Sequence, residues 1–416
     1  MKKASLIIIG NELLSGQTID TNSAYLGQRL MCLGVPVIKK HIVPDEVDAI
    51  EQALALAAQE ADIILVTGGL GPTDDDVSRQ GLAKFLGVDL KLHKDLIDDI
   101  RARFSAVSKE MPESNLIQAY IPDSAEPIKN DFGTAAGIKV YFQDKACFLM
   151  PGVPMELQQM FECSVVDLLK QIIGDQAVEI RKLRCFGIGE SALAVMLGDK
   201  MQRGRNPLIN CTVSCGVLTL HIIGQSQSAD QARKMVLDEQ KQLKDMLGSL
   251  VFGTGDETLA EVVGKDLIRN NQTLALAESC TGGLIGKYIT DCPGASRFFK
   301  QAWITYSNEA KIEQLDVSAE LINRYGAVSK QVAQAMAMGA RRKSNTNYSI
   351  AVTGIAGPEG GTKEKPVGLV FIGIDSDLGC KVKQCLFSRN REFIRQRAAQ
   401  TALHELWKRL NFDLSH

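Results

Sequence analysis

The sequence lacks the features that mark several large classes of protein. No apolar run approaches the roughly 20 residues of a membrane-spanning helix, and the run at residues 6–9 is too short for a secretion signal. The 47 Lys and Arg residues nearly balance the 49 Asp and Glu residues, so the net charge of −2 offers no general attraction for nucleic acid. The 10 cysteines form neither a disulfide-like framework nor paired Cys-x-x-Cys motifs for zinc. We therefore expect a cytoplasmic protein with no membrane segment.

The length and the apolar content of the chain indicate several domains. A chain of 416 residues is too long for one hydrophobic core, and 45% hydrophobic residues suffice to build two or three cores. From the pattern along the chain we predict a first domain at residues 1–172, a middle domain at 175–252 and a last domain at 256–416.

The first domain shows apolar strands that alternate with helical patterns. Residues 6–9, 61–66 and 146–150 are buried-strand runs, and residues 21–33 and 47–60 have helical periodicity. This alternation predicts an α/β fold with a mostly parallel sheet covered on both faces. In such sheets ligands bind beyond the carboxyl ends of the strands, where this sequence places polar, glycine-rich turns.

The most informative of these turns is residues 67–76, Thr-Gly-Gly-Leu-Gly-Pro-Thr-Asp-Asp-Asp. Its glycines allow backbone N–H groups to approach a phosphate closely. Carboxylates beside a phosphate are favourable if a divalent metal ion bridges them, and residues 20–22 could add oxygen ligands. The alternative is a solvated acidic turn that caps the helix starting near Val77.

Residues 10–16, 20–22, 67–76 and 151–154 resemble the amino-terminal domain of the competence/damage-inducible protein CinA family. That domain is similar to the molybdopterin-binding fold and is associated in the family with metal-dependent hydrolysis of ADP-ribose to AMP and ribose 5-phosphate. The resemblance implies that the substrate is bound by Glu12, Thr67, Gly68, Gly69 and Gly71, and that the divalent metal ion is held by Asp20, Asp75 and Asp76.

The middle domain reads as a small α+β unit. Residues 179–186 and 217–224 are strand-like, and residues 192–197 and 229–247 are helical. The unit is similar to the KH-like middle domain of the same family. However, residues 187–190 end in Glu190, so they do not form the Gly-x-x-Gly loop with which KH domains bind nucleic acid. We expect a spacer or dimer element, within a homodimer, rather than a nucleic-acid-binding module.

The last domain contains a short strand that ends in residues 278–283, Glu-Ser-Cys-Thr-Gly-Gly, followed by a helix from residue 284. Two hydroxyls and a thiol then lie beside helix N–H groups that have no intrahelical partner, a setting that favours an anion or an oxyanion. The alternative is a capped helix start without further function. Cys280 is a rival nucleophile to Ser279, although we favour a small core residue at this position.

A base for Ser279 is not found among the histidines. The last domain has only His404 and His416, both in the terminal helix and tail. A lysine whose pKa is lowered can serve instead, as in Ser–Lys hydrolases. Lys311 and Tyr306 flank a strand-to-helix transition from which both could reach Ser279. The alternative for Lys311 is an ordinary surface lysine.

Five ordered motifs, at residues 278–283, 294–296, 306–311, 326–329 and 353–358, resemble the nicotinamide mononucleotide (NMN) deamidase domain of the CinA family. The resemblance implies Ser279 as nucleophile, with Lys311 and Tyr306 managing its proton and no cofactor. It also implies that Thr281, Gly282 and Gly283 face the phosphate or the oxyanion, that Thr353, Gly354, Ala356 and Gly357 form the opposite wall, and that Arg391 holds the phosphate. Gln301 and Ala302 stand where the family has Gly-Gly, a change that could reshape the wall near Tyr306.

Taken together, the sequence predicts two hydrolases of pyridine nucleotide salvage in one chain. The last domain would convert NMN to nicotinic acid mononucleotide and ammonia, and the first would cleave ADP-ribose. Two alternatives remain open at this point. One is a non-enzymatic adaptor in competence or DNA repair that binds recombination proteins, and the other is a first domain that binds molybdopterin.

Overall fold

The computed structural model describes residues 2–174 and 177–411. By its internal contacts the chain divides into two compact units, residues 1–179 with 225–233 and residues 180–224 with 234–416. In chain order it forms a six-stranded, a four-stranded and a five-stranded sheet, with a two-stranded ribbon beside the first. Within the described ranges, no helix is long and apolar enough to cross a membrane. His416 and the predicted domain boundary at residue 175 lie outside the described residues.

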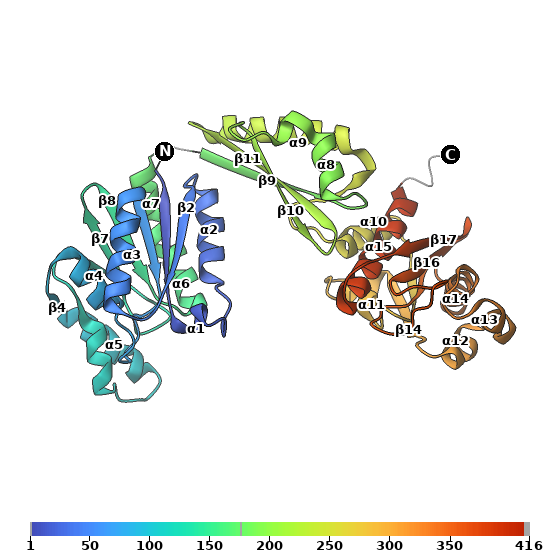
Figure 1. Cartoon of the computed structure of the whole chain (residues 1–416), viewed down its shortest axis with the longest axis horizontal. Coiled ribbons are helices and arrows are strands. Elements are labelled where there is room, and N and C mark those ends of the chain that lie inside the picture. The colour runs from blue at the N-terminus through green and yellow to red at the C-terminus, as the bar shows by residue number, and fades with distance from the viewer. Residues whose placement is uncertain (1, 175–176, 412–416) are drawn as a thin grey trace. The chain divides into compact units, whose positions relative to one another are not determined.

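The first sheet has the strand order β2-β1-β3-β8-β7-β6 (Figure 1). The strands β2, β1, β3 and β8 are mutually parallel, whereas β7 and β6 are antiparallel additions at one edge. The elements are β1 (Ala4–Ile9), α1 (Asn11–Leu14), α2 (Asn22–Cys32), β2 (Val37–Val43), α3 (Val47–Glu60), β3 (Ile63–Thr67), α4 (Ser78–Leu86), β4 (Leu90–Leu92), α5 (Lys94–Ala106), η1 (Glu113–Ala119), β5 (Tyr120–Pro122), β6 (Glu126–Ile128), β7 (Gly137–Phe142), β8 (Lys145–Met150), α6 (Pro154–Met160), η2 (Phe161–Val165) and α7 (Val166–Ile173).

The central strands of this sheet are apolar along their whole length because both faces are covered. In β1, Ile7 and Ile9 face the core built with α3, α4 and α5, whereas Leu6 and Ile8 face the core built with α2, α6 and α7. This alternation follows from the two-residue period of a strand. The predicted α/β class, with a mostly parallel sheet between helices, is confirmed.

The middle domain has the strand order β10-β11-β9-β12 and one core, in which α8 and α9 pack against the sheet. Its elements are β9 (Ala177–Cys185), α8 (Glu190–Leu197), η3 (Gly198–Met201), β10 (Leu208–Ser214), β11 (Val217–Ser226), α9 (Ala229–Leu247), η4 (Gly248–Leu250) and β12 (Val251–Thr254). Residues 251–254, which span the predicted end of the middle domain at residue 252, form an edge strand that pairs antiparallel with β9. Pairing with β9 decides their conformation, and such a distant partner leaves no local signal.

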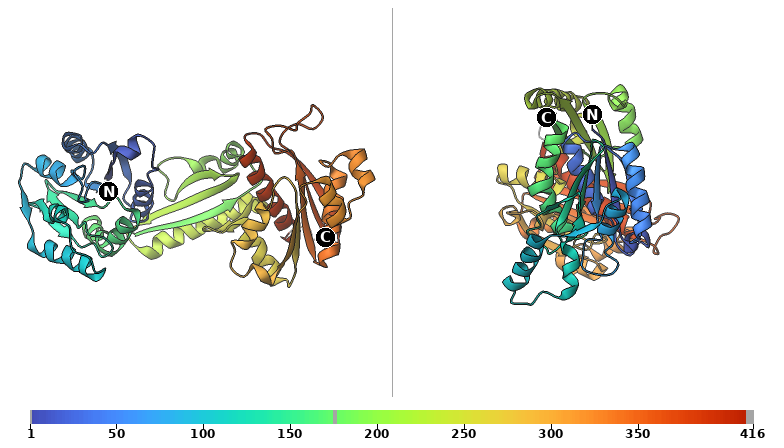
Figure 2. Two further views of the ribbon diagram at one scale, coloured as in Figure 1. Left: turned by 90° about the horizontal axis from the view of Figure 1, so that it is seen from below. Right: turned by 90° about the vertical axis from the view of Figure 1, so that its left-hand side faces the viewer.

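The last domain has the strand order β14-β13-β15-β16-β17, with the first three strands parallel and the last two antiparallel. The left view of Figure 2 shows the helices of residues 308–344, in orange, on one face and the terminal helix, in dark red, on the other. Its elements are α10 (Leu259–Arg269), β13 (Leu274–Glu278), α11 (Leu284–Thr290), η5 (Ala295–Arg297), β14 (Phe299–Ile304), α12 (Asn308–Leu315), α13 (Ala319–Tyr325), α14 (Lys330–Ser344), β15 (Tyr348–Gly354), β16 (Leu369–Ser376), β17 (Gly379–Leu386) and α15 (Arg391–Asn411).

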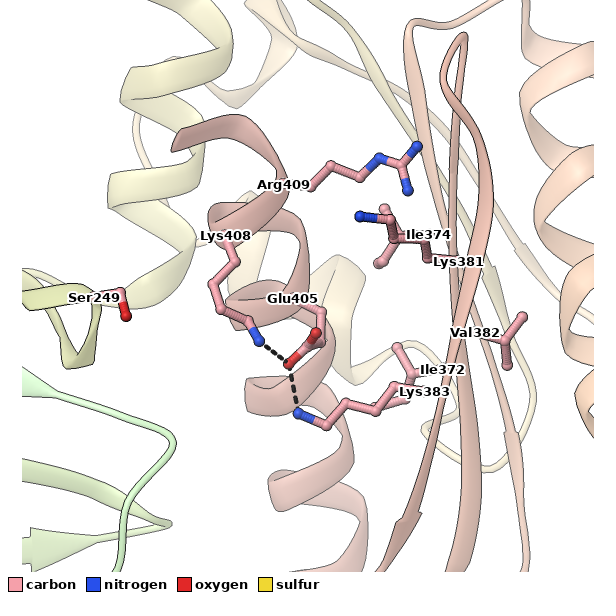
Figure 3. A pocket seen from close by; sticks show the side chains of 9 residues that line it. All are labelled: Ser249, Ile372, Ile374, Lys381, Val382, Lys383, Glu405, Lys408 and Arg409. Carbon is pink, nitrogen blue, oxygen red and sulfur yellow. Dashed lines mark hydrogen bonds and ion pairs between the residues drawn. The ribbon is translucent and has the colours of Figure 1, made fainter. Parts of the chain in front are cut away.

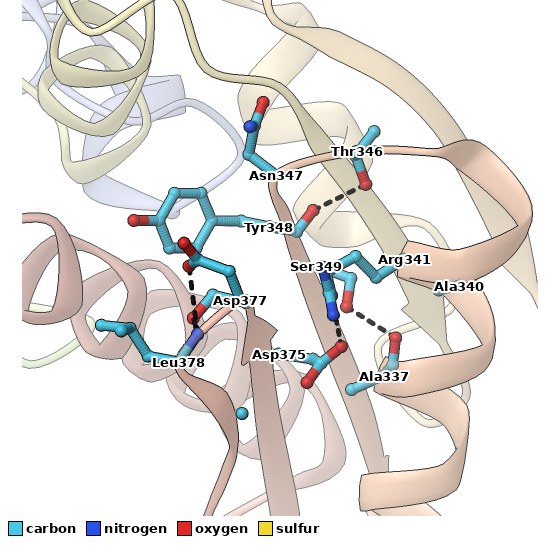
Figure 4. Close-up of polar contacts among 12 residues, drawn as sticks. Ala337, Ala340, Arg341, Thr346, Asn347, Tyr348, Ser349, Asp375, Asp377 and Leu378 are labelled. Atoms are coloured by element: carbon cyan, nitrogen blue, oxygen red, sulfur yellow. Dashed lines mark hydrogen bonds and ion pairs between the residues drawn. The ribbon is translucent and has the colours of Figure 1, made fainter.

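Polar contacts fix α14 on this sheet (Figure 4). Arg341 Nε donates to Asp375 Oδ2 of β16 at 2.5 Å, and only 3% of Asp375 is exposed. One strand away, Ser349 Oγ of β15 donates to the carbonyl of Ala337 at 2.6 Å. Because an unpaired buried carboxylate or hydroxyl is costly, these contacts define where α14 lies on β15 and β16. The position of α14 in turn supports the loop that carries Ala327 and Val328 toward the site described next.

Candidate active site

The turn after β13 places Ser279 at the carboxyl end of β13, an inner strand of the last sheet that lies between β14 and β15. All five residues of β13 are buried, and the Ser279 N–H donates to the carbonyl of Val352 on β15 at 3.0 Å. The chain then reverses through Gly282 and Gly283, with φ of 56° and 90°. These positive values suit glycine, because other residues clash with their own backbone there. The predicted strand, turn and helix are confirmed at this point.

Glu278, the last residue of β13, caps the helix that follows. Its side chain is fully buried and accepts from the N–H groups of Gly283 at 3.0 Å, Ile285 at 3.2 Å and Gly286 at 2.8 Å. A carboxylate at a helix N-terminus is stabilised by these donors and by the helix dipole. The N–H of Gly283 is therefore already engaged, and that of Gly282 donates to the carbonyl of Ser279. Sequence reasoning missed this role, although an acid at the strand end just before the helix is its signal.

Lys311 of α12 lies directly against Ser279. Its Nζ is 3.2 Å from Ser279 Oγ, 2.8 Å from the carbonyl of Thr305, and 3.3 Å from the carbonyls of Tyr306 and Ser307. Only 1% of Lys311 is exposed, so it is not a surface lysine. Its ammonium forms no ion pair with the described carboxylates, and burial lowers the pKa of Lys311 below its usual value. A lower pKa makes the neutral amine, which can accept a proton, easier to reach.

Tyr306 and Arg391 form a linked pair at the rim of the site. Tyr306 is 61% exposed, and its hydroxyl accepts from Arg391 Nη2 at 2.9 Å. Arg391 begins α15, and its Nη1 donates to the carbonyl of Gly357 at 2.7 Å. The guanidinium is thus held between two loops by two neutral acceptors, which do not neutralise its positive charge. That arrangement suits an anionic group at the rim.

A cavity of about 250 Å³ joins these groups. Of the predicted residues it is lined by Ser279, Lys311, Tyr306, Thr353, Gly354, Ala356, Gly357 and Arg391. Thr281, Gly282 and Gly283 do not line it. Thr281 is fully buried, and its carbonyl accepts from Arg395 at 2.7 Å. The cavity is also lined by Asn308, Val328 and Glu359, which were not predicted as site residues although each lies in or next to a recognised motif.

The other candidate reactive groups of the last domain lie in the core. Cys280 also lines the cavity, but it packs in the main apolar cluster and only 5% of it is exposed. Burial raises the pKa of its thiol to about 12, which disfavours the nucleophilic thiolate. His404 lies between the rings of Phe186 and Trp407, stacked on Trp407, and burial lowers its pKa to about 4. Of the groups considered, Lys311 alone lies within reach of Ser279.

The family departure at Gln301 and Ala302 falls outside this cavity. Both residues lie in β14, the exposed edge strand, where they pair with Ala275 and Leu276 of β13. Neither lines the cavity around Ser279. The departure therefore changes the edge of the sheet rather than the wall beside Tyr306.

The first domain has a smaller cleft at the carboxyl ends of β1 and β3, with a volume of about 110 Å³. It is lined by Ile8, Ile9, Glu12, Leu13, Thr18, Ile19, Asp20, Thr21, Asn22, Thr67, Gly68, Gly152 and Pro154. Asn22 donates through Nδ2 to Thr67 Oγ1 at 3.1 Å and to the carbonyl of Gly152 at 2.8 Å. Its Oδ1 is buried and finds no donor within the described part of the chain. Such an orphaned acceptor is costly unless a ligand or water supplies a donor.

The rest of the predicted first-domain set lies outside this cleft. Gly69, Gly71, Asp75 and Asp76 belong to a loop folded around Arg79, whose guanidinium donates to the carbonyls of Leu70 at 2.7 Å and Gly71 at 2.8 Å. Arg79 is only 2% exposed, so this loop has its own buried anchor. The glycines here allow close packing within the loop, because a Cβ on Gly71 would lie 2.3 Å from Asp76 Oδ2.

Comparison with known proteins places the chain. Family profiles match residues 5–171 ("Probable molybdopterin binding domain"), 180–253 ("Damage-inducible protein CinA KH domain") and 256–410 ("CinA C-terminal domain"). A relative from Clostridium botulinum, named as a competence-damage inducible protein, is 38% identical over 408 residues, which cover 98% of this chain and all of the relative. The chain belongs to the CinA family. A relative of the same name from Clostridium beijerinckii is 40% identical, over 97% of this chain and 98% of its own.

Among solved structures, two proteins are similar to part of the chain. One is the CinA protein of Thermoplasma acidophilum, 35% identical over 40% of this chain and 98% of its own, with a TM-score of 0.38. The other is a competence/damage-inducible protein of Agrobacterium tumefaciens, 40% identical over 37% of this chain and 93% of its own, with a TM-score of 0.36. The family membership and the order of the molybdopterin-binding-like, KH-like and CinA C-terminal domains confirm the resemblance stated above.

The donor set that the CinA resemblance assigns to a divalent metal ion is not gathered in this structure. Asp75 and Asp76 both accept from the hydroxyl of Thr73, whereas Asp20 accepts from the N–H and hydroxyl of Ser23. Across residues 2–174 and 177–411, no three His, Cys, Asp or Glu side chains are grouped so that they could hold a metal ion. These three carboxylates therefore do not fit a shared metal site as they stand, and the metal requirement remains a prediction.

Proposed function

We propose that the last domain hydrolyses the carboxamide of NMN to give nicotinic acid mononucleotide and ammonia. The observation that carries this proposal is the buried Lys311 Nζ, 3.2 Å from Ser279 Oγ inside a cavity that Arg391 borders. A lysine buried without an ion pair is costly to keep charged, and beside a serine it is the arrangement that activates a nucleophile.

In the proposed reaction, the neutral Lys311 amine accepts the proton of Ser279 Oγ as the oxygen attacks the carboxamide carbon. The tetrahedral intermediate collapses when its C–N bond breaks, and the departing amine takes the proton from Lys311 to leave as ammonia. Water then attacks the Ser279 ester, again losing a proton to Lys311, and the carboxylic acid departs as the proton returns to Oγ. Each step balances without a metal ion or redox partner, which agrees with simple amide hydrolysis.

Arg391 supports a substrate that carries a phosphate. Its guanidinium is fixed by the Gly357 carbonyl and the Tyr306 hydroxyl, and neither partner neutralises it. A guanidinium binds phosphate through paired, charge-assisted hydrogen bonds. The amide would then lie at Ser279 while the phosphate lies at the rim.

The test is release of ammonia from NMN by the purified full chain. We expect activity in the wild type and a loss of at least about 10³-fold in Ser279→Ala, because removal of a nucleophile abolishes the covalent route. Ser318→Ala is the matched control, since Ser318 is an exposed serine of the same domain that lies outside the five motifs and does not line the cavity. Ammonia release by Ser279→Ala at the wild-type rate would refute the proposal.

For the first domain we propose hydrolysis of ADP-ribose to AMP and ribose 5-phosphate. The proposal rests on family membership and on the polar cleft at the carboxyl edge of the sheet. In this cleft Asn22 Oδ1 has no hydrogen-bond donor among the described residues. The assay is AMP release from ADP-ribose, measured after chelation and again with added Mg²⁺. Binding of molybdopterin without any AMP release would favour the pterin-binding alternative instead.

A further inference from the structure

The last domain has a second and larger cavity, of about 570 Å³, away from Ser279 (Figure 3). Its floor is the end of the sheet, where Ile372 pairs with Lys383 and Ile374 with Lys381 across β16 and β17. The carboxyl-terminal half of α15 forms the facing wall. A volume of this size is in the range of small-molecule sites.

This cavity is distinct from the catalytic one. Arg391, at the Ser279 cavity, and Arg409, at the second cavity, lie at opposite ends of α15 and are 18 positions apart. A helix rises by 1.5 Å per residue, so the two ends are separated by about 27 Å. The two cavities share no lining residue.

The charges that line the second cavity are mostly positive. Lys383 and Lys408 both contact the carboxylate of Glu405, at 2.6 Å and 2.9 Å, as Figure 3 shows. Lys383, Lys408 and Arg409 carry three positive charges, and Glu405 carries one negative charge. Lys381 also lines the cavity and is not counted here. Both lysine side chains remain partly exposed, at 45% and 37%, so their ammonium groups are accessible to a ligand.

Arg409 supplies the observation that points to a ligand. Only 3% of this residue is exposed, and its Nε and Nη2 donate to Ser376 Oγ at 3.1 and 2.7 Å. Nη2 also donates to the carbonyl of Gly379 at 2.7 Å, whereas Nη1 is buried and has no acceptor among the described residues. A buried guanidinium N–H without an acceptor is costly, and an anion in the adjoining cavity would satisfy it.

We propose that this cavity binds the phosphate groups of a small phosphorylated ligand of nucleoside-diphosphate size. Arg409 Nη1, Lys383 and Lys408 hold the phosphates, and the remainder of the ligand occupies the rest of the cavity, whose floor is closed by the buried Ile372 and Ile374. Charge-assisted hydrogen bonds from Arg and Lys to phosphate are among the strongest polar contacts in proteins. The proposal is independent of the reaction assigned to Ser279.

The test is calorimetric titration of the full chain with ADP and, separately, with inorganic pyrophosphate. A metal chelator is present, so metal-dependent binding elsewhere does not contribute. We expect both probes to bind the wild type, and the Lys383→Gln/Lys408→Gln protein to bind at least about tenfold more weakly, because two charge-assisted contacts are lost.

The matched control is Lys265→Gln/Lys343→Gln. These lysines also pair with carboxylates, Glu257 and Asp316, but lie outside the cavity, so affinity should change by less than about twofold. Arg409→Lys is a further variant, which keeps the positive charge but has fewer N–H donors than arginine. It too should weaken binding. Absence of binding to the wild type, or equal affinity in the wild type and the Lys383→Gln/Lys408→Gln protein, would overturn the proposal.

Discussion

The cavity around Ser279 and the cleft of the first domain occupy the same kind of place, yet their charged groups are used differently. Both lie at the carboxyl ends of parallel strands. At Ser279, the partner Lys311 is 32 positions away in the sequence, is buried, and forms no ion pair with the described carboxylates. In the first domain, Asp20 and Asp76 bond to side chains three residues away.

The difference shows which motif residues carry chemical information. Acids that are satisfied by their own turn are what local capping predicts. A buried lysine that reaches a serine from a distant element has no such local explanation, and perturbed ionisable groups of this kind cluster at functional sites. The assignment of Ser279 and Lys311 therefore rests on geometry, whereas that of Asp75 and Asp76 rests on resemblance alone.

The largest effect is expected when the amine of Lys311 is removed, because this amine is the main difference between the Ser279 cavity and the first-domain cleft. Lys311→Met keeps an unbranched chain in the buried position and should lower kcat/KM for NMN by about 10²–10⁴-fold, the usual contribution of a general base. Lys343→Met, on α14 away from the cavity, should leave kcat/KM unchanged. Melting temperatures of both variants separate loss of chemistry from loss of fold. A fully active Lys311→Met protein would remove the main difference between the two sites.

The next test concerns the rim of the Ser279 cavity. Arg391→Gln should raise KM for NMN by about 10–100-fold, because a charge-assisted contact to phosphate is worth roughly 1.5–3 kcal/mol. The same variant should leave turnover of nicotinamide riboside, which lacks the phosphate, nearly unchanged. An equal rise in KM for both substrates would mean that Arg391 shapes the cavity and does not bind the phosphate.

The pH dependence of the reaction tests the burial of Lys311. Burial lowers its pKa below the usual 10.5, and the neutral amine is the active form. The rate should therefore rise with pH, about tenfold per pH unit at the acid end, and reach a plateau at high pH. The midpoint of this rise, which reports the pKa of Lys311, should lie below 10.5. The profile of kcat/KM for NMN measures this midpoint. A rate that falls as pH rises through this range would mean that the charged ammonium is required.

The smallest effects are expected in the first domain, where a carboxylate inside the cleft can be compared with one outside it. Asp20 lines the cleft and Asp75 does not. Asp20→Asn should thus lower AMP release from ADP-ribose by about tenfold or more, whereas Asp75→Asn should change it by less than about threefold, as expected for an exposed turn carboxylate. Neither substitution should affect ammonia release from NMN. A larger loss in Asp75→Asn would show that its loop rearranges to join the cleft.

Much of the fold could be predicted from the sequence because its signals are local. Helices α3 and α9 begin and end at the predicted residues, 47–60 and 229–247, since each combines strong helical periodicity with clear ends. The antiparallel strands β6, β7 and β12 were not predicted. Short strands of this kind are stabilised by pairing with distant partners, which leaves little trace in their own sequence.

The candidate site also has features that could be predicted from the sequence and features that could not. The placement of Ser279 at a strand end and the approach of Lys311 agree with the sequence-based expectation, because both follow from strand-to-helix turns. The cap formed by Glu278 and the loop anchor formed by Arg79 could not be predicted in the same manner. Each is a buried charge whose partners are backbone groups, and backbone partners are not encoded by residue type.

The central claim is that Ser279 becomes acylated during hydrolysis of NMN. It is tested most directly by rapid quenching of the turning-over enzyme, followed by mass spectrometry of the peptide that contains Ser279. We predict that this peptide carries the acyl group of the nucleotide on Ser279, that Lys311→Met carries little of it, and that Ser279→Ala carries none. An adduct on Cys280, or turnover by Ser279→Ala at the wild-type rate, would contradict the account.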